Sequence, residues 1–358
     1  MTKLLVVDDS ALMRRVLGEI FRDEDGFEVA FARDGVEALA QLHAFQPDVI
    51  TLDVQMPQMN GLSCLDRIMV ERPCPVVMVS SLTGDGAEAT LSALELGAVD
   101  FVLKPPGTVS LAIDDLSRVL IEKVRGAAAS RMPSSRRLAE RLRARAAARP
   151  EPRSAQKRRA DRVTDALEGV VIIGTSTGGP PALDAVLSQL SGDFPWPILV
   201  AQHMPAAFTA SLARRLDGLC ALRVMEVTRP TPLAAGCVYV ARGDADMIVS
   251  MRGTGPVAMP VPASDTYRWH PSVDRLVSSA AAIFPAAQLV GVLMTGMGND
   301  GAQAMAALRA GGGRTIAESE DSAVVWGMPG ELVRAGGADV VVPLEMIAGR
   351  LVDMVAAR

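Results

Sequence analysis

The sequence predicts two α/β domains, each built on a doubly wound parallel sheet, joined by a basic linker. Short apolar runs alternate with helical patterns through residues 1–124 and again through residues 166–358. Such alternation is typical of a parallel sheet with helices on both faces. The length of 358 residues agrees with two domains, because single hydrophobic cores usually stop growing at about 250–300 residues.

Five strand–helix repeats predict a flavodoxin-like N-terminal domain over residues 1–124. The apolar runs expected to form its strands are Leu4–Val7, Glu28–Ala32, Val49–Leu52, Val76–Val79 and Phe101–Leu103. The helices are expected to follow Ser10, Asp34, Asn60, Gly86 and Leu111. Because a helical pattern separates each pair of strands, we expect the strands to run parallel.

Residues 125–165 differ in composition from both flanking regions. Between Arg125 and Arg162 there are thirteen Arg or Lys residues against three acidic residues, a net charge of +10. Large apolar residues are nearly absent, so we predict a linker, with a solvated helix around Ser135–Arg149. A nucleic-acid-binding arm is the alternative interpretation. The whole chain has a net charge of −5, however, and no nucleic-acid partner is expected.

From Val170 the alternation resumes and predicts a Rossmann-like second domain over residues 166–358. The runs expected to form its sheet are Val170–Ile173, Ile198–Ala201, Leu289–Leu293, Arg314–Ala317 and Asp339–Val342. Between Val224 and Val261 the sequence is richer in Pro and Gly, with short β-like runs at Val238–Ala241 and Met247–Met251. This stretch predicts a small antiparallel insertion.

The composition indicates a globular protein with reduced thiols. Hydrophobic residues make up 49% of the chain, yet no apolar run approaches the roughly 20 residues needed to cross a membrane. No metal-binding or disulfide pattern is formed by the cysteines, which are Cys64, Cys74, Cys220 and Cys237. The first residues do not read as a secretory signal. We therefore expect a cytoplasmic location and no membrane insertion.

Carboxylates follow two strands of the first domain. Asp8 and Asp9 come directly after the first predicted strand, and Asp53 directly after the third. Functional groups gather beyond the carboxyl ends of strands in such sheets, and three hard oxygen ligands suit Mg²⁺. Ser80 follows the fourth strand and Lys104 the fifth, so the set could transfer phosphate onto Asp53. Taken singly, an aspartate could cap the first helix, and Lys104 could be a surface lysine.

This pattern resembles a response-regulator receiver domain. The matching positions are Val-Val-Asp-Asp-Ser at 6–10, Asp53 with Met56, Pro57 and Gly61, Ser80, and Lys104 with Pro105. The resemblance implies that Asp53 is the phosphoacceptor and that the Mg²⁺ ligands are Asp8, Asp9, Asp53 and the carbonyl of Gln55. It also implies Ser80 and Phe101 as switch residues, Lys104 as the phosphate-binding cation, and a chemotaxis-type histidine kinase as partner.

A glycine-rich loop opens the second domain. The segment Gly-Thr-Ser-Thr-Gly-Gly at 174–179 lies between a predicted strand and a predicted helix. Its glycines allow a sharp turn, so Ser176 could project at the sheet edge as in a nucleophile elbow. The backbone N–H groups that begin with Thr177 could receive an oxyanion. The loop contains neither a dinucleotide fingerprint nor a P-loop, and the alternative interpretation is an ordinary helix start.

A serine nucleophile needs a base, and the chain has three histidines. His43 falls in a helix of the first domain, whereas His203 directly follows a strand and His270 precedes a helix. The position of His203 directly after a strand favours a catalytic base at this residue over a structural histidine. Asp300 lies in a glycine-rich loop after the strand Leu289–Leu293 and could orient the imidazole, or could instead cap the helix after Gly301.

These loops resemble the catalytic domain of chemotaxis protein-glutamate methylesterases. The resemblance implies Ser176 as nucleophile, His203 as general base and Asp300 as its orienting carboxylate. Thr177 and the Met297 backbone would stabilise the oxyanion. The implied substrates are glutamate methyl esters, and also glutamines, of methyl-accepting chemotaxis receptors, with Mg²⁺ serving only the receiver and no cofactor in the hydrolase. Pro-Ser-Val-Asp at 271–274 also matches, while the family often has arginine at the position of His270, whose role stays open.

We further expect phosphorylation of Asp53 to relieve an inhibition of the hydrolase by the receiver. Two other interpretations stay open. A non-catalytic regulator could use its second domain only to bind protein or nucleic acid, and would give the basic linker a purpose. A hydrolase of another acyl substrate would use the same three residues, because the shape of the crevice decides substrate choice.

Overall fold

The computed structural model describes residues 1–22, 24–80, 84–104, 113–130, 167–253 and 255–356. The chain divides into two compact units, Met1–Pro152 and Arg153–Arg358, and each is described by itself. The helix expected around Ser135–Arg149 lies outside the described residues. Helix α5 (Ile113–Ala128) continues past residue 125, where the linker was expected to begin.

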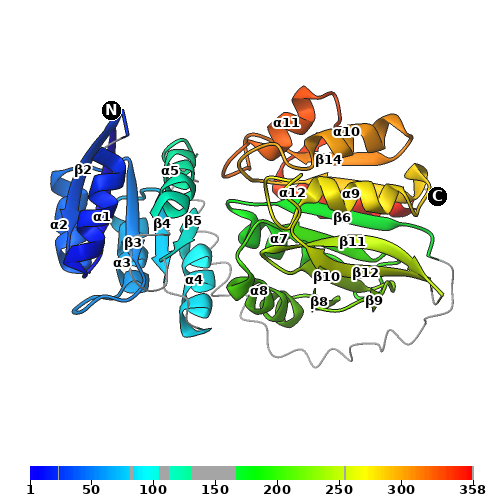
Figure 1. Cartoon of the computed structure of the whole chain (residues 1–358), viewed down its shortest axis with the longest axis horizontal. Coiled ribbons are helices and arrows are strands. Elements are labelled where there is room, and N and C mark those ends of the chain that lie inside the picture. The colour runs from blue at the N-terminus through cyan, green and yellow to red at the C-terminus, as the bar shows by residue number, and fades with distance from the viewer. Residues whose placement is uncertain (23, 81–83, 105–112, 131–166, 254, 357–358) are drawn as a thin grey trace. The chain divides into compact units, whose positions relative to one another are not determined.

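The first unit is a five-stranded parallel sheet with the strand order β2-β1-β3-β4-β5 (Figure 1), as the flavodoxin-like prediction requires. Its strands are β1 (Thr2–Val7), β2 (Phe27–Ala32), β3 (Val49–Asp53), β4 (Val76–Ser80) and β5 (Asp100–Leu103). Its other helices are α1 (Ala11–Arg22), α2 (Gly35–Ala44), α3 (Gly61–Glu71) and α4 (Gly84–Leu96). Each expected strand is confirmed to within two residues.

Local chemistry explains where these elements begin. β3 and β4 are buried along their whole length, which is why they read as unbroken apolar runs. Asp34 accepts the N–H groups of Val36 and Glu37 at the start of α2, and Asn60 accepts that of Ser63 at the start of α3. These N-caps satisfy backbone donors that have no partner inside the helix.

The second unit contains a seven-stranded sheet with the order β15-β14-β13-β6-β7-β10-β8, and all its pairings are parallel. Its strands are β6 (Val170–Thr175), β7 (Ile198–Gln202), β8 (Arg223–Val227), β10 (Cys237–Ala241), β13 (Leu289–Leu293), β14 (Arg314–Glu318) and β15 (Val340–Val342). The helices are α7 (Gly179–Leu187), α8 (Ala206–Leu219), α9 (Val273–Ala281), α10 (Ala302–Ala310), α11 (Met328–Arg334) and α12 (Leu344–Ala356), with a 3₁₀ turn at Ala286–Gln288. The strands β7, β10 and β8 lie on one side of β6, and the later strands β13, β14 and β15 lie on its other side. The strand order therefore reverses between β6 and β13.

The expected antiparallel insertion exists but is smaller than predicted. It consists of β11 (Ala245–Arg252), β12 (Gly255–Pro262) and β9 (Thr231–Pro232). The run Val238–Ala241, which we expected in the insertion, instead forms β10 of the main sheet, parallel to β7 and β8. β10 is buried at every residue, as a central parallel strand should be.

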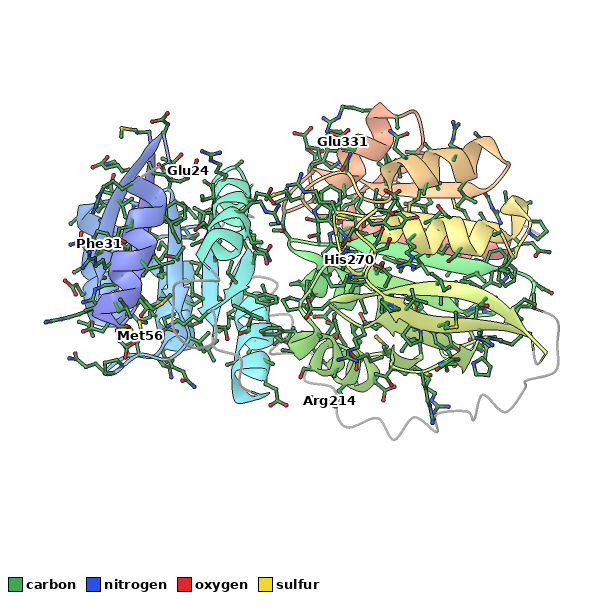
Figure 2. The ribbon with its side chains drawn as sticks, viewed as in Figure 1. Glu24, Phe31, Met56, Arg214, His270 and Glu331 are labelled. Carbon is green, nitrogen blue, oxygen red and sulfur yellow. The ribbon has the colours of Figure 1, made fainter. Side chains whose placement is uncertain are left out.

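Side chains fill the space between the sheet and the helices of each unit (Figure 2). Aromatic residues are few, at 4% of the chain, so the core of the second unit is formed mainly by Val, Ile, Leu, Ala and Met. Within the described residues, no helix is both long enough and apolar enough to cross a membrane.

Candidate active site and acidic pocket

The loops that carry Ser176, His203 and Asp300 follow three adjacent strands of the second sheet. β6 lies between β7 and β13, at the point where the strand order reverses and where such sheets place their sites. The N–H of His203 donates to the carbonyl of Thr175, and the N–H of Ser176 donates to that of Thr295, each over 3.0 Å. These bonds hold the three loops side by side at the carboxyl edge of the sheet.

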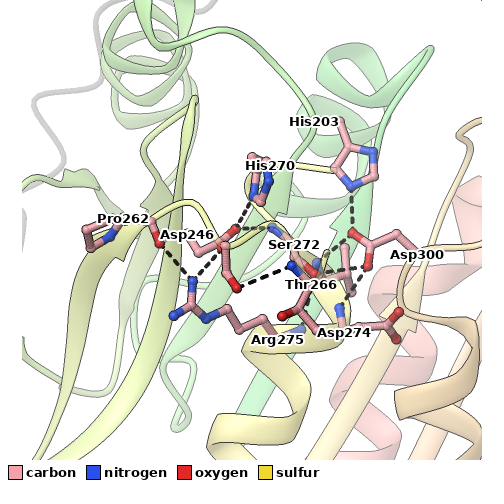
Figure 3. A network of polar contacts seen from close by, with 11 residues as sticks. His203, Asp246, Pro262, Thr266, His270, Ser272, Asp274, Arg275 and Asp300 are labelled. Carbon is pink, nitrogen blue, oxygen red and sulfur yellow. Dashed lines mark hydrogen bonds and ion pairs between the residues drawn. The ribbon is translucent and has the colours of Figure 1, made fainter. Parts of the chain in front are cut away.

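His203 and Asp300 are in direct contact (Figure 3). The Nε2 of His203 lies 2.8 Å from Oδ2 of Asp300, and the two side chains are 9% and 2% exposed. The other ring nitrogen, Nδ1, is buried and makes no hydrogen bond to any described residue, Ser176 included. Nε2 therefore faces the carboxylate, whereas in the serine-protease triad Nδ1 does so.

Asp300 is anchored by the beginning of α9. Its carboxylate accepts the N–H groups of Val273 and Asp274 over 2.7 and 3.0 Å, and the hydroxyl of Ser272 over 3.2 Å. Burial acts to raise the pKa of Asp300, but the hydrogen bond and charge of His203 and the two N–H groups outweigh it, so the pKa is lowered. Asp300 therefore stays ionised. It binds the first N–H groups of α9, whose N-cap is Ser272, and it does not cap the helix after Gly301, where no side chain makes a cap hydrogen bond.

The expected oxyanion loops lie against each other. A side chain at Gly296 would place its Cβ 2.8 Å from the Cβ of Ser176, so only glycine allows this approach. Gly178 has a φ of +76°, which lets the chain turn directly after Thr177. Met297 and Thr177 are thus carried by two loops that meet at Ser176. Their role in binding an oxyanion stays a prediction.

His270 belongs to a second histidine–carboxylate pair. Its Nδ1 lies 2.9 Å from Oδ1 of Asp246, a fully buried carboxylate that also binds Arg275 and the N–H of Ser272. Ser272 thereby links this pair to Asp300 (Figure 3). Trp269 stacks on the His203 ring, with centroids 6.1 Å apart and planes at 3°. No sequence pattern indicated Asp246, which lies 24 residues before His270 along the chain.

Glu318 is a second residue that sequence reasoning missed. It ends β14, is fully buried, and accepts the N–H of Thr295 over 2.7 Å and the hydroxyl of Ser322 over 2.9 Å. Burial, opposed by these two hydrogen bonds and supported by the charge of Glu345, raises the pKa of Glu318 to about 7. Its position directly after a predicted strand was the available signal.

The raised pKa of Glu318 predicts a pH-dependent stability. The folded state holds the proton up to about pH 7, whereas the unfolded chain releases it near 4.5. The folded state therefore loses stability as pH rises through this window, by about 3 kcal/mol at 1.36 kcal/mol per pKa unit. Chemical denaturation at pH 4 and pH 8 should show Glu318→Gln gaining stability relative to wild type as pH rises. Parallel pH curves for the two proteins would contradict the raised pKa.

The first unit brings its predicted carboxylates together. One ligand oxygen from each of Asp8, Asp9 and Asp53 lies within 4.8 Å of the other two. Lys104 bridges two of them, with Nζ 2.8 Å from Asp8 and 2.6 Å from Asp53. Burial, and to a smaller degree the charge of Asp8, raise the pKa of Asp53 against the opposing effect of Lys104. A dense cluster of carboxylate oxygens is a donor set that fits Mg²⁺.

The other residues expected in this pocket have different surroundings. Lys104 is mostly buried, at 19% exposure, so it is not a simple surface lysine. Ser80 and Phe101 are buried in β4 and β5, and the backbone N–H of Lys104 donates to the carbonyl of Ser80 over 2.8 Å. The N–H of Gln55 donates to Asp53 over 3.3 Å. The use of its carbonyl as a metal ligand stays a prediction.

Each of the two units matches the model of a known protein family. Residues 171–351 match the family model described as CheB methylesterase, and residues 4–113 match that of the response regulator receiver domain. The second unit is similar to the crystal structure of the Thermotoga maritima CheB methylesterase catalytic domain. The TM-score is 0.50 at 36% identity, covering 52% of this chain and 98% of that one.

Two curated relatives match almost the whole chain. The Rhodopseudomonas palustris (strain BisB18) protein named protein-glutamate methylesterase/protein-glutamine glutaminase 2 is 54% identical, covering 99% of this chain and 98% of the relative. A Rhodospirillum rubrum protein with the same name and the number 3 is also 54% identical, over 98% of this chain and 95% of the relative.

Proposed function

Because this chain belongs to the CheB methylesterase family and carries an N-terminal receiver domain, we propose that Ser176, His203 and Asp300 hydrolyse glutamate methyl esters of chemotaxis receptors. The chain is a protein-glutamate methylesterase/protein-glutamine glutaminase with a receiver domain, as its full-length similarity to such enzymes indicates. The contact between His203 and Asp300 beside the Ser176 loop supports the residue assignment.

The proposed reaction has two steps. Ser176 Oγ bonds to the ester carbonyl carbon while Nδ1 of His203 takes its proton, and the N–H groups of Thr177 and Met297 bind the oxyanion. The imidazolium, held at Nε2 by Asp300, then protonates the methoxide, which leaves as methanol. Water, deprotonated by His203, releases glutamate and restores Ser176. With a glutamine side chain the leaving group is ammonia.

We assign phosphorylation of the receiver to Asp53, with a chemotaxis-type histidine kinase as phosphate source. Asp8, Asp9, Asp53 and the Gln55 carbonyl would hold Mg²⁺, which when bound offsets the negative charge of carboxylates and phosphate. Lys104 would contact a phosphoryl oxygen, and Ser80 and Phe101 would respond to it. The cluster of carboxylates around Lys104 supports these roles. We also place the protein in the cytoplasm.

Methanol release from membranes that carry methyl-labelled receptors tests the proposed substrate. The full-length chain should release labelled methanol, and a small-molecule phosphodonor with Mg²⁺ should raise the rate. Asp53→Asn should keep the basal rate and lose the increase, because the acyl phosphate cannot form. Asp48→Asn, on the loop before β3, is the matched control and should respond to the phosphodonor like wild type.

Three results would count against the proposal. No methanol release would exclude the receptor substrate and favour a hydrolase of another ester. Equal wild-type rates with and without the phosphodonor would exclude control by the receiver. An increase that survives Asp53→Asn would exclude Asp53 as the phosphoacceptor.

A further inference from the structure

A buried carboxylate outside the triad contacts the loop beside the nucleophile. Glu318 lies at the end of β14, with no exposed surface. Its Oε2 accepts the N–H of Thr295 and its Oε1 accepts the hydroxyl of Ser322. It forms no ion pair with any described residue. An ionisable group in this setting is costly to bury, and nothing in the proposed reaction uses it.

Thr295 connects Glu318 to the nucleophile. Its carbonyl accepts the N–H of Ser176 and the hydroxyl of Thr175, both over 3.0 Å. Its own hydroxyl donates to the carbonyl of Thr177 over 2.9 Å. Thr295 therefore binds the side chain of Thr175 and the backbone of both Ser176 and Thr177. Glu318 accepts the N–H of Thr295. Thr295 alone therefore links Glu318 to each of these bonds.

Glu318 also holds the segment on the far side of the loop. The backbone carbonyl of Glu318 accepts the indole N–H of Trp326 over 2.8 Å. The hydroxyl oxygen of Ser322 accepts the backbone N–H of Leu344 over 2.9 Å. The 322–328 segment in turn binds Gly296, whose N–H donates to Val325 and whose carbonyl accepts the N–H of Met328. Gly296 thus lies between two segments that Glu318 fixes, directly before Met297.

We propose that Glu318 is a positioning residue of the hydrolase, which fixes Thr295 so that the Ser176 loop and the Met297 loop keep their catalytic spacing. The inference rests on the proposed function of Ser176 and Met297. What the site requires is an acceptor oxygen at the position of Oε2. A protonated Glu318 keeps that oxygen and can donate from the other to Ser322, so either protonation state performs the role.

The charged and titratable surroundings of Glu318 agree with a role that does not depend on charge. Glu345, at the start of α12, acts on it with the same sign and raises its pKa. The groups that contact the carboxylate from the 295 loop and from the 322 segment are an amide and a hydroxyl, both neutral. An uncharged side chain of the same shape should therefore position Thr295 equally well.

Three substitutions in the full-length, phosphodonor-activated chain separate the possibilities. Glu318→Gln keeps the acceptor in place and should retain kcat within about threefold. Glu318→Asp keeps the charge but withdraws the oxygen by one methylene, and Glu318→Met removes it. Both should lower kcat by about 10- to 100-fold with KM within twofold, since a displaced oxyanion donor costs up to about 10²–10³-fold.

The matched control is Thr315→Val at the opposite end of the same strand. Thr315 is equally buried and bonds to Gly337 and Asp339, so its loss weakens β14 without touching the Thr295 loop. It should lower the melting temperature and leave kcat per folded molecule unchanged. Active-site titration with an organophosphonate that labels Ser176 gives the concentration of folded enzyme in every variant.

The outcomes are distinct. If Glu318→Asp keeps wild-type kcat per titrated site, or if Glu318→Gln falls as far as Glu318→Met, the positioning role is wrong. The Asp variant decides the matter even where the Met variant fails to fold, because it is the smallest change. A wild-type chain that releases no methanol would instead overturn the proposed function itself.

Discussion

Replacing Ser176 with alanine is expected to lower kcat for methanol release by at least about 10⁴-fold, to the level left by binding and oxyanion stabilisation alone. In the proposed reaction the hydroxyl oxygen bonds to the ester carbon, and alanine has no atom that can replace it. KM should change little, since the Oγ contributes to the reaction rather than to holding the receptor. The measurement is methanol release from methyl-labelled receptor membranes, at saturating substrate.

The control for this experiment is Ser188→Ala. Ser188 is an exposed serine at the C-terminal end of α7, the helix that follows the nucleophile loop, and its loss should leave kcat unchanged. Residual activity above about one hundredth of wild type in the Ser176→Ala chain would assign the chemistry to another group. Unchanged receptor-dependent output in that variant would instead support the non-catalytic regulator considered from the sequence.

The sheets were predictable because parallel strands buried on both faces leave unbroken apolar runs. β13 was expected at Leu289–Leu293 and occurs there. The error at β10 arose because an apolar run shows that a strand is buried but not which strands flank it. The surrounding stretch is richer in Pro and Gly and indicated an antiparallel insertion, yet the run Val238–Ala241 pairs in parallel with β7 and β8 in the main sheet.

The three candidate catalytic residues could be proposed from the sequence because each directly follows, or lies in the loop after, a recognisable strand. Glu318 also ends a strand, but its partner is the backbone N–H of Thr295, and a sequence does not show which backbone donors lack a partner. Asp246 lies on the antiparallel strand β11 and His270 in the loop before α9. Only the folded chain brings the two side chains together. The choice of Nε2 over Nδ1 for Asp300 depends on ring orientation, which spacing cannot specify.

Replacing Asp300 with asparagine is expected to lower kcat by about 10³- to 10⁴-fold. Oδ2 of Asp300 accepts from both His203 and Val273, and Oδ1 accepts from Asp274 and Ser272. An amide must place its NH₂ group against one of the two backbone N–H donors. The variant therefore loses the negative charge that stabilises the imidazolium, and it also leaves one buried N–H facing another donor.

That second effect predicts a cost in stability, of about 1–3 kcal/mol for an unsatisfied buried donor, so activity has to be expressed per active site. Asp184→Asn serves as control, because Asp184 is also buried in the second unit but binds Arg215 on α8. It should lose stability and keep kcat, whereas Asp300→Asn should lose both. If the two variants lose stability equally and both keep kcat, then Asp300 only holds the start of α9, and the reaction does not need a carboxylate hydrogen-bonded to His203.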